Sequence, residues 1–66
     1  MNFGERLKLI RTSRELDVED LADATKIHAS TIKRIERRGI RPSLPTVKKL
    51  ADALNVKAAL LLGVTK

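Results

Sequence analysis

The side chains best suited to chemistry lie between positions 29 and 38, where long cations are mixed with small residues. At about 100° per residue of an α-helix, Lys33, Arg34 and Arg37 share one face with Ala29 and Ser30. Ammonium and guanidinium groups donate hydrogen bonds to base edges and phosphates, and small neighbours let a helix approach a groove closely. This face therefore predicts a contact with nucleic acid.

The opposite face of the same segment predicts burial. Ile32 and Ile35 fall within one arc, where they can anchor the helix to a core. Asp17 is a suitable N-cap for a preceding helix over residues 18–25. Residues 17–38 are thus expected to form two short helices joined by a tight turn.

The rest of the chain predicts three more helices and no sheet, because no segment alternates apolar and polar residues with a period of two. The plainest helical signal is the apolar series Val47, Leu50, Ala51 and Leu54. The expected limits are residues 3–14 after an Asn2 cap, a helix that begins at Ser43 or Thr46 and ends at Asn55, and residues 57–62 before Gly63.

Length and composition limit the kind of protein this is. The 66 residues predict one domain over residues 1–66, and without cysteine there are no disulfides or thiolate metal sites. No apolar run of about 18 residues and no signal-peptide pattern is present, so we expect a soluble, cytoplasmic protein that contacts no membrane. His28 is the lone histidine and has no nucleophile signature near it. We expect no enzyme, no catalytic or metal-ligating residue, no cofactor and no small-molecule ligand.

Charge is distributed unevenly along the chain. Counting Lys and Arg as +1 and Asp and Glu as −1, residues 1–14 carry +3, 15–25 carry −5, 26–49 carry +7 and 50–66 carry +1, which sums to +6. The basic segment favours a polyanionic partner. The acidic segment before it would weaken binding if it faced DNA, whereas carboxylates at a helix amino end favour the helix dipole and can point along or away from DNA.

The order and spacing of these residues resemble the phage-repressor and Cro-like helix-turn-helix proteins, also called XRE-like. The resemblance covers nearly the whole chain. It implies an all-α fold, a compact five-helix lambda-repressor-like domain with the helix-turn-helix at about 17–38. The runs that carry it are residues 16–22, Ile27, residues 30–32 and 35–37, and residues 42–44 before the apolar series 47–54.

Such proteins are sequence-specific transcriptional regulators of double-stranded DNA, most simply repressors, that place the second helix of the motif in the major groove. The resemblance implies base reading by Ala29, Ser30 and Arg34, with Lys33 beside them. Arg34 can bond guanine O6 and N7, and Ala29 can touch a thymine methyl group.

The same resemblance implies contacts with the DNA backbone. The family commonly has Gln at position 18 and Gly at positions 15 and 26, where this chain has Val18, Glu15 and Lys26. The amide of Val18 can still hold a phosphate at a helix amino end, and Lys26 is expected to adopt positive φ. His28 is expected at an N-cap, where its ring accepts an amide hydrogen or meets a phosphate. The expected phosphate contacts are Val18, Lys26, His28, Arg37, Arg38 and Arg41.

Two further pairings follow from the resemblance. Arg11 and Glu36 match an ion pair that ties the first helix to the third. The last helix is the expected site of a homodimer contact through Leu60, Leu62 and Val64, and the alternative is that Leu62 and Val64 fold back onto the first helix. A two-fold dimer would place two reading helices about 34 Å apart on a near-palindromic operator.

Two other interpretations remain open at this point. The chain can be a protein-interaction adaptor on the same fold, which the acidic segment and the absent Gln at Val18 favour. It can also be the DNA-binding domain of a longer regulator.

Overall fold

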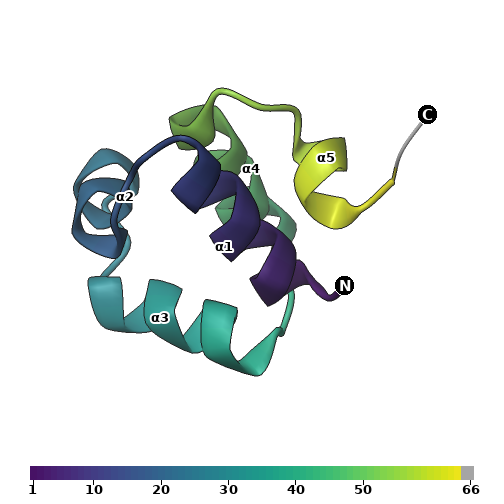
Figure 1. Cartoon of the computed structure of the whole chain (residues 1–66), viewed down its shortest axis with the longest axis horizontal. Helices are drawn as coiled ribbons and strands as arrows, with labels where there is room; N and C mark the ends of the chain where they lie inside the picture. The colour runs from purple at the N-terminus through teal and green to yellow at the C-terminus, as the bar shows by residue number, and fades with distance from the viewer. Residues whose placement is uncertain (65–66) are drawn as a thin grey trace.

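The computed structural model describes residues 1–64, which form five α-helices and no strand (Figure 1). The all-α, five-helix prediction is confirmed for this part of the chain, and the helix limits lie within a few residues of those expected. The domain prediction also includes residues 65 and 66, which lie outside the described residues. The helices are α1 (Phe3–Ser13), α2 (Val18–Thr25), α3 (Ala29–Arg38), α4 (Leu44–Leu54) and α5 (Ala58–Leu62).

Two helices begin at reciprocal caps. Asn2 Oδ1 accepts a hydrogen bond from the backbone N–H of Glu5 at 2.8 Å, and Glu5 Oε1 accepts one from the backbone N–H of Asn2 at 3.0 Å. Asp17 and Asp20 repeat this arrangement at the start of α2, with distances of 2.8 and 3.2 Å. Each pair satisfies two amides that a helix start leaves without a partner, so both boundaries are fixed locally.

The starts of α3 and α4 have no such caps. His28 occupies the N-cap position of α3, but its side chain makes no capping hydrogen bond. The expectation that its ring accepts an amide hydrogen is therefore wrong. Ser43 likewise caps α4 by position only, and its hydroxyl meets Thr46 Oγ1 at 3.1 Å. Since these helices gain nothing from a side-chain cap, their stability depends on packing.

Four of the helices end at a residue with left-handed backbone conformation, that is, with positive φ. A fifth residue of this kind lies in the loop after α1. Lys26 has φ of 63°, as expected for the turn between α2 and α3. A side chain with a Cβ in this region costs on the order of 1 kcal/mol relative to glycine. The others are Glu15 (60°), Gly39 (74°), Asn55 (60°) and Gly63 (79°).

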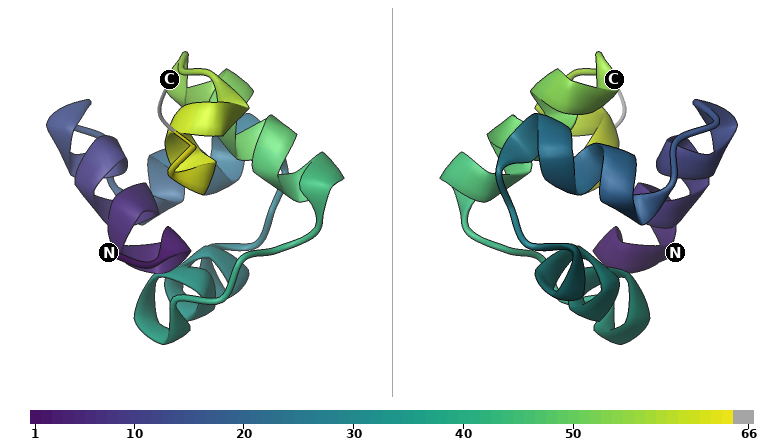
Figure 2. Two further views of the ribbon diagram at one scale, coloured as in Figure 1. Left: turned by 90° about the vertical axis from the view of Figure 1, so that its right-hand side faces the viewer. Right: turned by 90° about the vertical axis from the view of Figure 1, so that its left-hand side faces the viewer.

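A small core receives side chains from every helix. α3 packs against α1 and α2, while α4 packs against α2 and α5. Figure 2 shows α3 along one edge of the molecule, with the other helices on its inner side. Each fully buried leucine or isoleucine contributes about 1.5–3 kcal/mol relative to an exposed one. The largest fully buried side chains are Leu7, Leu21, Ile32, Val47, Leu50, Leu54 and Leu61.

The end of α2 holds a buried polar residue. Leu21 of this helix is fully buried and Ala22 is half-buried, while the polar Thr25 is only 6% exposed. The Thr25 hydroxyl donates to the Leu21 carbonyl at 2.7 Å and accepts from the Ile27 amide at 3.2 Å. Both bonds brace the turn that leads into α3. None of the helices within residues 1–64 has the length and apolar character needed to cross a bilayer.

Candidate nucleic-acid interface

The outer face of α3 is cationic because its inner face is anchored by two isoleucines. Ile32 is fully buried and Ile35 is 7% exposed. The exposed side chains on the outer face surround a shallow hollow, and α3 forms the lower edge in both views of Figure 2. A convex helix with donors on its open side has the shape needed to enter a groove. The residues around this hollow are Ser30, Lys33, Arg34, Arg37 and Arg38.

A second hollow lies over the turn between α2 and α3. Lys26, His28 and Ala29 line it together with Glu19 and Asp23 of α2. Lys26 and His28 are exposed, whereas Ala29 is half-buried. The turn therefore places one predicted base-reading residue, Ala29, beside two predicted phosphate contacts, and it also places two carboxylates there. Arg41, another predicted phosphate contact, is exposed in the loop after α3.

The amino end of α2 carries its own negative charge. The carboxylates of Asp17 and Asp20 accept amide hydrogens of this helix, so they already interact with its positive end. The Val18 side chain packs against the core instead of facing outward. Any contact of Val18 with a phosphate must therefore come from its backbone amide, beside two carboxylates that reduce the attraction.

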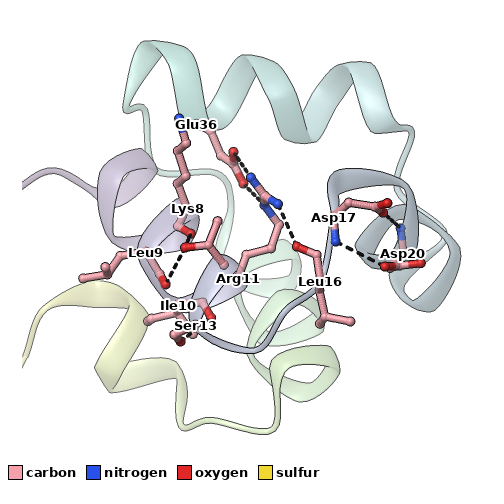
Figure 3. A network of polar contacts seen from close by, with 10 residues as sticks. Lys8, Leu9, Ile10, Arg11, Ser13, Leu16, Asp17, Asp20 and Glu36 are labelled. Atoms are coloured by element: carbon pink, nitrogen blue, oxygen red, sulfur yellow. Dashed lines mark hydrogen bonds and ion pairs between the residues drawn. The ribbon is translucent and has the colours of Figure 1, made fainter.

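A buried ion pair connects α3 to α1 (Figure 3). Arg11 Nε donates to Glu36 Oε2 at 2.8 Å and Nη2 donates to Oε1 at 3.1 Å, while Nη1 donates to the Leu16 carbonyl at 2.8 Å. The two side chains are 10% and 8% exposed. The hydrogen bonds with Glu36 raise the pKa of Arg11, burial opposes this rise, and the charges of Glu36 and Asp17 add to it. Arg11 thus joins α1, α3 and the segment before α2.

A glycine contact fixes the carboxyl end of α3. Gly4 is buried where α1 crosses α3, and a Cβ there would lie 2.7 Å from Gly39 Cα and 2.8 Å from the Glu36 carbonyl oxygen. Sequence reasoning missed this contact. The sequence feature that could have predicted it is the glycine itself, because it lies in the first turn of a helix, where helix propensity disfavours glycine and no turn requires it.

Fewer apolar side chains are well exposed in and just after α5 than the sequence predicts. Leu60 and Val64 are 44% and 61% exposed, whereas Leu62 is half-buried and packs against the core. Leu61 is fully buried, and its carbonyl accepts from Arg6 Nη1 at 3.5 Å. Among the predicted dimer residues, Leu60 and Val64 therefore offer most of the apolar surface.

Comparison with known proteins adds evidence independent of this geometry. The helix-turn-helix family profile matches residues 7–65. The chain is 44% identical over 57 residues to the HTH-type transcriptional repressor RghR of Bacillus subtilis (strain 168), covering 83% of this chain and 42% of that protein. It is 35% identical over 63 residues to the immunity repressor protein of Bacillus phage phi105, covering 96% of this chain and 44% of that protein.

A solved structure shows the same arrangement of helices. The restriction-modification controller protein C.AhdI from Aeromonas hydrophila is similar, with a TM-score of 0.85 and 35% identity over 91% of each chain. The chain spans less than half the length of the two curated repressors.

Proposed function

The chain belongs to the phage-repressor and Cro-like (XRE-like) helix-turn-helix family, and from that premise we propose that it is a sequence-specific DNA-binding transcriptional regulator, most simply a repressor. The observation that supports this most directly is the outer face of α3. Its cations and Ser30 are exposed together, while Ile32 and Ile35 hold the opposite face in the core. The proposed activity is binding, without catalysis.

In the proposed complex α3 lies in the major groove. Ala29, Ser30, Lys33 and Arg34 read bases, with Arg34 bonding guanine and Ala29 near a thymine methyl group. Their support is that Ser30, Lys33 and Arg34 are exposed around one hollow. Phosphates are held by the turn before α3 and by the residues toward and beyond its end. These proposed contacts are the Val18 amide, Lys26, His28, Arg37, Arg38 and Arg41.

We further propose a two-fold homodimer on a near-palindromic operator, with one reading helix for each half-site. Its support is the exposed apolar surface in and just after α5, where Leu60 and Val64 extend beyond what the core covers. Leu62 contributes its uncovered edge.

Substitution of Arg34 tests the base-reading role. Arg34→Ala should lower affinity for the cognate duplex by about 1–3 kcal/mol and leave non-cognate binding nearly unchanged. Arg37→Ala is the matched control, since a phosphate contact should weaken binding to all sequences about equally. Fluorescence anisotropy with both duplexes gives the six affinities of the wild type and the two variants. Equal losses on both duplexes for Arg34→Ala would make Arg34 a phosphate contact and contradict its assigned role.

The second candidate function is a protein-interaction adaptor, favoured by the exposed carboxylates of α2. Salt dependence distinguishes the two. DNA binding should weaken linearly in log affinity against log salt, with the slope reduced by about one for each phosphate contact removed. An adaptor would have no DNA affinity near physiological salt, and therefore no salt slope that falls as the proposed phosphate contacts are removed.

A further inference from the structure

A third hollow borders the proposed reading face of α3 and differs in character from the cationic hollow around Lys33 and Arg37. Thr31 and Ile35 of α3 form one side of it, and Ile40 and Pro42 of the following loop form another. Its walls are mostly apolar, and Arg34 is the one cation among the described residues that line it. Arg34 also lines the cationic hollow, so this side chain borders both hollows.

Ile40 gives this hollow an unusual surface. Its side chain is 60% exposed, so the core does not explain why an isoleucine lies there. The hollow encloses about 250 Å³. A methyl group is close in size to a water molecule, whose share of liquid volume is about 30 Å³. The space therefore admits a methyl group together with the edge of the ring that bears it.

The occupant that we consider matches both the apolar wall and the cation beside it. An apolar side chain from a protein would fill the hollow but would make no use of the donors of Arg34, which is exposed. A thymine next to a guanine provides both groups in the major groove, since thymine presents a 5-methyl group and guanine presents the acceptors O6 and N7.

We infer that Ile40 and Thr31 form a specificity pocket for the 5-methyl group of a thymine adjacent to the guanine that Arg34 reads. This inference rests on the proposed function and refines it. It assigns a sequence preference to a loop residue outside the reading helix, and it adds a second methyl contact to the one proposed for Ala29.

The test begins with the duplex that the protein selects from a random pool. Each thymine of a half-site is replaced in turn by deoxyuridine, which lacks only the 5-methyl group. Separately from any loss at the thymine near Ala29, burial of one methyl group predicts that the wild-type protein loses about fourfold in affinity at the thymine beside the guanine that Arg34 reads. At that position, a duplex with 5-methylcytosine should bind about fourfold tighter than the same duplex with cytosine.

Two truncations assign this methyl effect to a residue. Ile40→Ala should remove it, so that thymine and deoxyuridine duplexes bind equally. Leu44→Ala is the matched control, because Leu44 is also 60% exposed and does not line the hollow. This variant should keep the fourfold ratio. Since both side chains are exposed, both variants should unfold at the wild-type temperature.

Three results would overturn the inference. Equal binding of thymine and deoxyuridine duplexes at every position shows that no methyl group is read. The proposed function would still stand in that case, because the protein had selected a sequence from the random pool. A methyl effect that persists in Ile40→Ala places the methyl group on another residue, such as Ala29. Failure to select any sequence overturns the proposed function and this inference together, and is thereby distinguished from the other two.

Discussion

Arg11 is the residue on which the placement of α3 depends most. Each of the three guanidinium nitrogens donates a hydrogen bond, two to Glu36 and one to the Leu16 carbonyl. The pairing with Glu36 could be expected only through resemblance to a family, because the two residues are 25 positions apart and either can be a solvated surface charge. The third hydrogen bond, to the Leu16 carbonyl, could not be predicted from any feature of the sequence.

Breaking this pair should destabilise the fold severely. Arg11→Leu leaves the buried Glu36 carboxylate without its partner, and we expect the free energy of unfolding to fall by about 3–5 kcal/mol. The double variant Arg11→Leu with Glu36→Leu removes both charges and should be more stable than the single variant. Urea unfolding measures both. A loss below about 1 kcal/mol for the single variant would show that the pair behaves as an exposed surface pair.

Among single residues, the sequence predicted correctly those features that depend on neighbours close in the chain. The Asn2 and Asp17 caps and the positive φ of Lys26 follow from neighbours within a few positions. His28 failed as a cap because position alone does not orient an imidazole ring.

At the scale of elements, the contact between α1 and α3 decides how the cationic face is presented. Besides the ion pair, the two helices approach closely at Gly4, which lies against the backbone of Glu36 and Gly39. The helices themselves could be predicted because apolar spacing reports which face of each is buried. Their close approach could not, because periodicity does not report the distance between helix axes.

Replacing this glycine should separate α1 from the end of α3. Gly4→Ala adds a Cβ that meets backbone atoms, which cannot move as side chains do. Such overpacking costs about 1–3 kcal/mol, against about 1 kcal/mol gained in helix propensity. We expect lower thermal stability and weaker DNA binding. Thr12→Ala, at an exposed position of α1, is the control and should lower neither. A Gly4→Ala protein more stable than wild type would contradict the close approach.

At the scale of the whole molecule, the densest runs of like charge lie on different elements. A run of cations follows α3 and its adjoining loop, and a run of carboxylates lies on and just before α2. Exposed apolar side chains are spread more widely, and Leu60 and Val64 lie in and just after α5. The sequence predicts the separation of charge through its runs of like charge. It could not predict how much of α5 the core covers, because Leu62 turns inward only in the folded chain.

The dimer is tested by adding a charge to α5. Leu60→Lys should leave the unfolding temperature near that of wild type, because this side chain is 44% exposed, but it should halve the mass in solution and weaken operator binding. Leu9→Lys is the matched control at an exposed leucine of α1 and should retain the dimer mass. Light scattering at equal concentrations decides between them. Unchanged mass and affinity in Leu60→Lys would place the interface elsewhere.

The central claim is that α3 reads a DNA sequence, and the most direct test is selection of bound duplexes from a random pool at near-physiological salt. We predict a two-fold-symmetric motif whose half-sites lie about one helical turn, roughly 34 Å, apart. A pool that remains random after repeated selection would contradict the claim, because a cationic helix that only neutralises phosphates enriches no sequence.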